Sequence, residues 1–122
     1  HQVGKEYYDK LKKNENIFMP ETTRSYAKNI YWVIAFIIIN KNLNIDAKKL
    51  MKELLKFGIQ TRPFFWPMHK QKILRKKIKN NKNDNFENSE YISKYGLYLP
   101  SSLSITKKEI NFICNKINFI LR

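Results

Sequence analysis

The apolar run "WVIAFIII" at residues 32–39 limits most strongly what this chain can fold into. Its β-branched and aromatic side chains favour a β-strand, and the lack of polar alternation predicts a strand that is buried on both faces. Asn40 ends the run. Because a membrane-spanning helix needs roughly 20 apolar residues, the run is far too short to cross a bilayer. We therefore expect a soluble protein, with no membrane partner, built around a buried strand.

Helical periodicity occurs on both sides of this strand. Val3, Tyr7 and Leu11 recur at intervals of four, which predicts a helix over residues 3–13. Asp46 is a good N-cap for a second helix, which Gly58 would end. A capping box, "TKKE" at 106–109, opens a third. The apolar stripes of these two helices are Ala47, Leu50, Met51 and Leu54, then Ile110, Ile113, Cys114, Ile117 and Leu121.

Shorter segments complete the order of elements. "IQTR" at 59–62 reads as a strand stopped by Pro63, and "LYLP" at 97–100 reads as a third strand. "ENSEYISKYG" at 87–96 predicts a short helix, whereas the polar residues 76–88 predict an exposed loop. The expected fold class is α+β (or α/β), with a small sheet of about three strands covered by helices.

The strongly basic composition allows two interpretations. The chain of 122 residues carries a formal net charge of +14, and lysine greatly outnumbers arginine. A basic nucleic-acid-binding module, indicated by the net charge and by exposed aromatic rings, is one interpretation. The lysines are scattered over predicted helix faces, apart from the cluster at 69–82. The joint excess of Lys, Asn and Ile, which A/T-rich codons encode, favours solvated helix faces instead. No RNA-binding signature or zinc-finger spacing accompanies the lysines, so we expect no specific nucleic-acid partner.

Few residues offer chemistry of their own. Cys114 is the only cysteine, which excludes an internal disulfide and suits a cytoplasmic location. His1 and His69 are too few and too far apart in the chain to predict a metal site. Glycine-rich phosphate loops, paired-histidine motifs and a nucleophile elbow are not found in the sequence. The residues alone therefore predict no catalytic centre.

Three blocks nevertheless resemble a known family. "NIYWVIAF", "DAKKLMKELLKFGIQTRPFFWPMHKQ" and "YGLYLPSSLSITKKEINFICNKI" are similar, in order and spacing, to the C-terminal part of the DegT/StrS family of sugar aminotransferases. The "TRPFFWPMHKQ" motif most resembles the perosamine-synthetase branch, which acts on GDP-4-keto-6-deoxymannose. One departure is Lys72, which stands where the family usually has a proline.

The resemblance implies a fold-type-I enzyme that depends on pyridoxal 5'-phosphate. It would move an amino group from glutamate to the keto carbon of a nucleotide-sugar, as a homodimer, in O-antigen or other polysaccharide biosynthesis. The chain would be the C-terminal small domain, with residues 1–28 the end of a connecting helix and loop and residues 29–122 the domain core. The large domain, which carries the Schiff-base lysine and binds the cofactor, would be missing. We therefore assign no catalytic, cofactor-binding or metal-binding residue here, and expect this chain alone to be inactive. A non-catalytic fragment that acts only as a partner is the other alternative.

The resemblance also implies a substrate wall built by residues 58–71. Arg62 would bind a carboxylate or phosphate with two parallel hydrogen bonds, or else form a salt bridge to a nearby acid. Phe64 and Phe65 would form an apolar wall against a sugar or cofactor ring, whereas core packing is favoured for Trp66. His69 would hydrogen-bond a sugar or phosphate oxygen, or else cap the helix that follows it. The candidate substrate-binding residues are thus Arg62, Phe64, Phe65 and His69.

Overall fold

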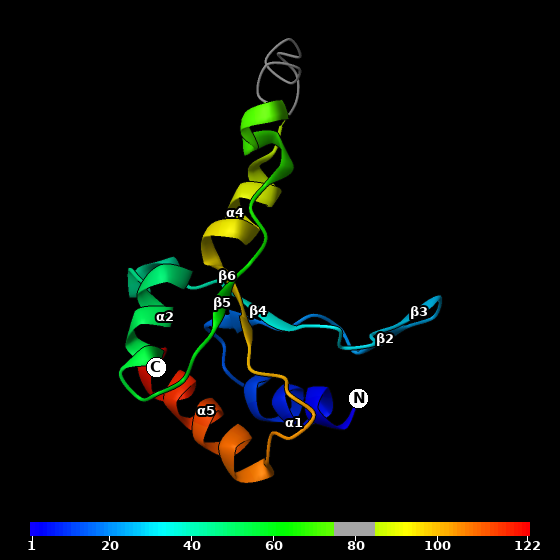
Figure 1. Ribbon diagram of the computed structural model, residues 1–122, viewed down its shortest axis with the longest axis vertical. Coiled ribbons are helices and arrows are strands. Elements are labelled where there is room, and N and C mark those ends of the chain that lie inside the picture. Colours follow the sequence, from blue (N-terminus) through cyan, green and yellow to red (C-terminus); the bar gives the residue numbers. More distant parts are fainter. Residues whose placement is uncertain (75–84) are drawn as a thin grey trace.

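The computed structural model describes residues 1–74 and 85–122, so most of the predicted 76–88 loop lies outside the described residues. Its helices are α1 (Gln2–Leu11), α2 (Ala47–Leu55), α4 (Glu87–Tyr95) and α5 (Lys107–Ile120), with 3₁₀ turns η1 (Lys41–Leu43) and η2 (Met68–Lys70). Its strands are β1 (Ile17–Phe18), β2 (Thr23–Arg24), β3 (Ala27–Lys28), β4 (Ile34–Ile38), β5 (Arg62–Pro63) and β6 (Gly96–Leu99). Figure 1 shows helices gathered against a small sheet, with the β2–β3 hairpin projecting away from the body.

The main sheet is antiparallel and has four strands in the order β1-β4-β6-β5. All three predicted strands belong to it. β1 was not predicted, because a strand of two residues leaves too short a pattern in the sequence. The prediction for the second strand was wrong in its bounds, because Pro63 is part of β5 and pairs with Leu97. Proline is tolerated there since β5 is the edge strand of the sheet, where a missing N–H costs little.

The register of the strands divides the sheet into two chemically different faces. Ile34 pairs with Leu99 and Phe36 with Leu97, so these side chains share one face. The opposite face carries Ala35, Ile37 and Tyr98 from the central strands, Phe18 from β1, and Arg62 from β5. Phe18 and Arg62 are exposed, and Ile37 and Tyr98 are half-buried. We call this second surface the open face.

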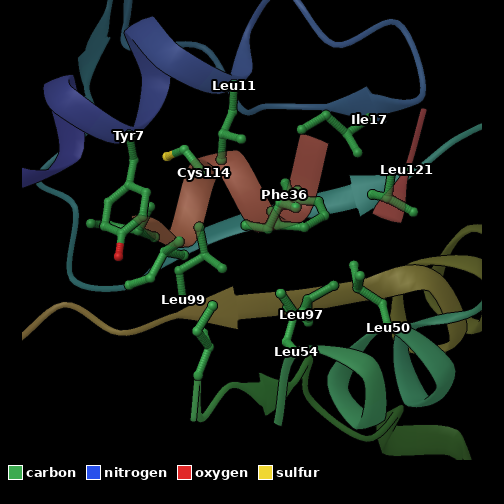
Figure 2. Packing of buried hydrophobic residues seen from close by; sticks show 14 of the residues in the cluster. Tyr7, Leu11, Ile17, Phe36, Leu50, Leu54, Leu97, Leu99, Cys114 and Leu121 are labelled. Carbon is green, nitrogen blue, oxygen red and sulfur yellow. The ribbon is translucent and has the colours of Figure 1, made fainter. Parts of the chain in front are cut away.

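The helices cover only the first face. Tyr7 and Leu11 of α1, Leu50 and Leu54 of α2, and the predicted stripe of α5 pack with Phe36 and Leu97 into one hydrophobic core (Figure 2). The Tyr7 hydroxyl, which enters this core, donates a hydrogen bond of 3.0 Å to the Pro100 carbonyl. The layered α+β class is confirmed. The predicted burial of the 32–39 run on both faces is confirmed only in part: Ala35 is buried on the open face, but Ile37 is half-buried and Trp32 is 73% exposed.

The predicted caps of α2 and α5 are confirmed, whereas α1, predicted over residues 3–13, ends at Leu11. The Asp46 carboxylate accepts from the Lys49 N–H, and Thr106 and Glu109 form the reciprocal capping box. Gly58 adopts a positive φ of 74°, and two hydrogen bonds, Gly58 N–H to Leu55 O and Ile59 N–H to Leu54 O, close a Schellman motif. Within the described part of the chain, no helix is long and apolar enough to span a membrane.

Candidate functional site

Arg62 occupies a defined place on the open face. It lies on edge strand β5 and pairs with Tyr98 of β6, while the next residue on its face, Phe64, continues the pairing through its N–H to the Gly96 carbonyl at 3.0 Å. The Arg62 side chain is exposed. Among residues 1–74 and 85–122, no carboxylate forms a salt bridge with its guanidinium. The salt-bridge alternative for Arg62 therefore has no partner in the described part of the chain.

Aromatic rings surround the Arg62–Tyr98 pair. The Tyr98 ring contacts Phe64 and Phe65 with centroids 6.0 Å and 5.7 Å away, and Phe64 and Phe65 meet edge-on at 5.6 Å. Trp32 stacks on Phe65 at 6.0 Å with an interplanar angle of 14°. Since Trp32 and Phe65 remain 73% and 52% exposed, these rings form an accessible apolar wall beside a cationic group. We call these four rings and Arg62 the aromatic wall.

Trp66 differs from expectation. Core packing was favoured for Trp66, and this prediction is wrong, since the side chain is 60% exposed. The residue that the fold buries is Pro67. Trp66 instead borders a surface hollow of about 530 Å³ together with Lys70, Gln71, Lys72 and Ile73. The lysine at position 72 thus adds a cation to this hollow.

His69 belongs to a second group of side chains, on the flank of α4. Its Nε2 lies 2.9 Å from Oε1 of Glu90, and its ring stacks on Phe86 with centroids 4.2 Å apart and an interplanar angle of 11°. Lys70 Nζ reaches the other oxygen of Glu90 at 2.9 Å. The His69 ring therefore hydrogen-bonds a carboxylate of α4.

The charges around Glu90 favour its ionised form. Hydrogen bonds from Lys70 and then from His69 hold the pKa of the Glu90 carboxyl below its ordinary value. Both interactions favour the carboxylate over the neutral acid. Glu90 is therefore an acceptor-only group at neutral pH, with both oxygens engaged by residues of η2.

The structure brings together three of the four predicted site residues. Arg62, Phe64 and Phe65 share the aromatic wall. His69 belongs to a separate group, with Glu90, Lys70 and Phe86. Sequence reasoning missed Trp32, Tyr98 and Glu90. The position of Tyr98 follows from the alternation in "LYLP", but its pairing with Arg62 does not, because that depends on which strands are neighbours.

The described lysines, in residues 1–74 and 85–122, are not buried. Several pair with surface carboxylates, as Lys12 does with Asp9, and others lie over aromatic rings, as Lys116 does over Phe57. The hollows that these residues line are open to solvent. No cluster of three potential metal ligands occurs within these described ranges. This part of the chain can bind and orient a ligand.

Solved structures share this fold. DesI, solved with its TDP-sugar product, has a TM-score of 0.81 at 18% identity, covering 99% of this chain and 30% of its own. PseC of Helicobacter pylori, an aminotransferase of pseudoaminic acid biosynthesis, has a TM-score of 0.80 at 13% identity, covering 98% and 31%. At these identities the likeness shows the fold. The chain thus has the α+β fold found in one part of sugar-modifying enzymes.

Sequence comparison then identifies the family. The model of the DegT/DnrJ/EryC1/StrS aminotransferase family matches residues 1–118, so the chain belongs to that family. The uncharacterized protein MJ1066 of Methanocaldococcus jannaschii is 25% identical over 120 residues, which cover 98% of this chain and 31% of that protein. The chain therefore spans less than a third of the relatives that it matches. The resemblance of the three sequence blocks to this family is confirmed.

Proposed function

We propose that this chain is the C-terminal small domain of a pyridoxal-phosphate-dependent enzyme that moves an amino group from glutamate to the keto carbon of a nucleotide-sugar. Pyridoxal phosphate is the cofactor of the family, whose members use an amino donor and a nucleotide-sugar. The observation that carries the proposal is the family match over residues 1–118. The accessible Arg62 on the open face supports it, since such a group suits a phosphorylated ligand.

Each site residue has a binding task in this proposal. The Arg62 guanidinium would donate two parallel hydrogen bonds to a phosphate or carboxylate, which a lysine could not reproduce. Phe64 and Phe65 would exclude water from the adjoining sugar or cofactor ring. His69 would contact a sugar hydroxyl. The bound cofactor supplies the electron sink for amino transfer, and the protein supplies position.

The remaining parts of the enzyme are proposed to lie outside this chain. The large domain would carry the cofactor-binding lysine, since the described lysines are surface residues. A homodimer, a cytoplasmic location and residue 28 as the end of the connecting segment remain predictions. The "TRPFFWPMHKQ" motif supports GDP-4-keto-6-deoxymannose as the first substrate to test. The expected product would then be of the perosamine type.

The alternatives receive less support. The described lysines include several paired with acidic neighbours, among them Lys56 with Glu53 and Lys107 with Glu6. A nucleic-acid module would instead need cations concentrated on one surface. A non-catalytic partner role would predict that a complete coding region yields no active enzyme.

The decisive experiment is expression of the complete coding region that contains this segment. We expect release of 2-oxoglutarate when glutamate and GDP-4-keto-6-deoxymannose are supplied with the cofactor, and parallel reactions with TDP- and UDP-linked keto sugars test the nucleotide. The 122-residue chain is the control and should show no turnover and no saturable, lysine-bound cofactor absorbance. Turnover by this chain alone would overturn the domain assignment, and inactivity of the complete protein with all three sugars would overturn the aminotransferase proposal.

A further inference from the structure

The side-chain group on the flank of α4 constrains the chemistry of His69. The imidazole is held on two sides, by the Phe86 ring at 4.2 Å and by the Glu90 carboxylate at 2.9 Å from Nε2. The His69 side chain is only 11% exposed, although η2 is a surface turn. These contacts fix the plane of the ring and the position of Nε2.

The partner of Nε2 decides which nitrogen carries the proton. An ionised carboxylate can only accept hydrogen bonds, so the nitrogen that faces Glu90 must be protonated. The Lys70 ammonium, 2.9 Å from the second oxygen, further favours the ionised form of Glu90. When His69 is neutral, the lone pair of Nδ1 can accept a hydrogen bond from a hydroxyl group.

We propose that Glu90 is a positioning residue for His69: it holds Nε2 as the protonated nitrogen and so makes Nδ1 the acceptor for a substrate hydroxyl. The identity of that substrate as a nucleotide-linked sugar rests on the proposed function, whereas the orientation of the ring does not. Glu90 acts through His69 and need not touch the substrate.

Nuclear magnetic resonance of the ¹⁵N-labelled 122-residue chain tests the orientation without any substrate. The chain has two histidines, so His1 is an internal reference. We expect a protected Nε2–H resonance for His69, a pyridine-like Nδ1, and contacts between the His69 and Phe86 ring protons. Glu90→Ala, which removes the acceptor, should abolish the protection of Nε2–H. Glu87→Ala, which removes an acid from the same helix, and Lys70→Met, which removes the other partner of Glu90, should preserve it.

Kinetics of the complete enzyme test the role toward substrate. Glu90→Ala should raise KM for the nucleotide-sugar about tenfold and leave KM for glutamate unchanged, because losing an oriented hydrogen bond costs roughly that factor. In a His69→Ala background the same substitution should have no further effect, since the two residues act as a unit.

Each result separates the two proposals. An Nδ1–H tautomer, or a protected Nε2–H in Glu90→Ala, would overturn the positioning role whatever the enzyme does. A correct tautomer with unchanged or additive kinetics would overturn the substrate role of Nδ1. Inactivity of the wild-type enzyme would overturn the proposed function and leave the resonance result to decide the orientation of His69.

Discussion

At the scale of single residues, Arg62 shows how a strand end can hold a charged group ready for a ligand. Its backbone pairs with Tyr98 of β6 in the sheet, and its side chain is exposed. The described carboxylates form no salt bridge with its guanidinium. Arg24 has the opposite situation, since its Nη2 donates to Glu21 at 2.6 Å. The two arginines therefore form a natural comparison between a cation available for a ligand and one already paired.

We expect Arg62→Ala in the complete enzyme to lower kcat/KM for the nucleotide-sugar by about tenfold to a hundredfold, the effect of losing roughly 1.5–3 kcal/mol of charged hydrogen bonding. Arg62→Lys should recover only part of this, because it keeps the charge without the planar fork. Arg24→Ala is the matched control and should leave the kinetics unchanged. Wild-type kinetics with a lowered melting temperature would show that Arg62 is a structural residue.

Cys114 and Tyr7 make the core sensitive to alkali. Burial raises the pKa of the Cys114 thiol from 9.0 to about 12, and burial, followed by the charge of Cys114, raises the pKa of Tyr7 well above its ordinary value. Both groups are neutral in the folded core and ionise more readily when unfolded. Their contribution to stability is thus fully present below the unfolded pKa values and declines as pH rises toward the folded ones.

We therefore expect the free energy of unfolding to fall between about pH 9 and pH 12, measured by denaturant titration at a series of pH values. Cys114→Val removes one titrating group at similar volume and should make the decline shallower. The native thiol should react slowly with thiol reagents at neutral pH and rapidly in denaturant. A pH-independent stability over this range would contradict the burial argument.

At the scale of elements, the end of α2 depends on one backbone conformation. Gly58 has a φ of 74°, and an added Cβ would have nothing within 4 Å, so a substitution there tests backbone strain without a steric clash. Gly58→Ala should cost about 1 kcal/mol of unfolding free energy. Gly58→Asn should cost less, because asparagine tolerates the left-handed region better. Equal losses for the two variants, measured by denaturant titration, would show that the Schellman motif is not the cause.

At the scale of the whole molecule, the open face exposes more apolar side chains than the face that the helices cover. Phe18 is 50% exposed there. Phe65, which contacts Tyr98, and Trp32, which stacks on Phe65, are 52% and 73% exposed, whereas Ile34, Phe36, Leu97 and Leu99 on the other face are buried. Exposed apolar groups gathered on one surface mark a place where another surface packs or a ligand binds. In our proposal that second surface belongs to the large domain.

The isolated chain should accordingly bind a hydrophobic dye and self-associate. Trp32→Ser combined with Phe65→Ser should reduce both effects without lowering the melting temperature, because neither ring belongs to the core. Phe119→Ser on α5, where Arg122 lies over the ring, is the control and should leave both effects in place. A monomeric wild-type chain that binds no dye would contradict this picture.

What the sequence determined by itself was local. Asp46, Gly58 and the Thr106–Glu109 box set helix ends through contacts within a few residues, and the stripe from Ile110 to Leu121 set which side of α5 is buried. Such features depend on backbone geometry that recurs in any fold. The resemblance of the three blocks to the family was also recognisable, because the order and spacing of motifs along the chain are properties of the sequence.

Only the tertiary structure decided which distant groups meet. Gly4 sits in α1 because the ring of Tyr31 occupies the place of its Cβ, a contact that no pattern near Gly4 indicates. The pairing of Arg62 with Tyr98, and of His69 with Glu90, likewise required strand order and helix placement. The exposure of Trp32 was likewise not indicated by the apolar run in which it lies. Local patterns determine what each segment forms, whereas the packing of segments against one another determines which side chains become neighbours.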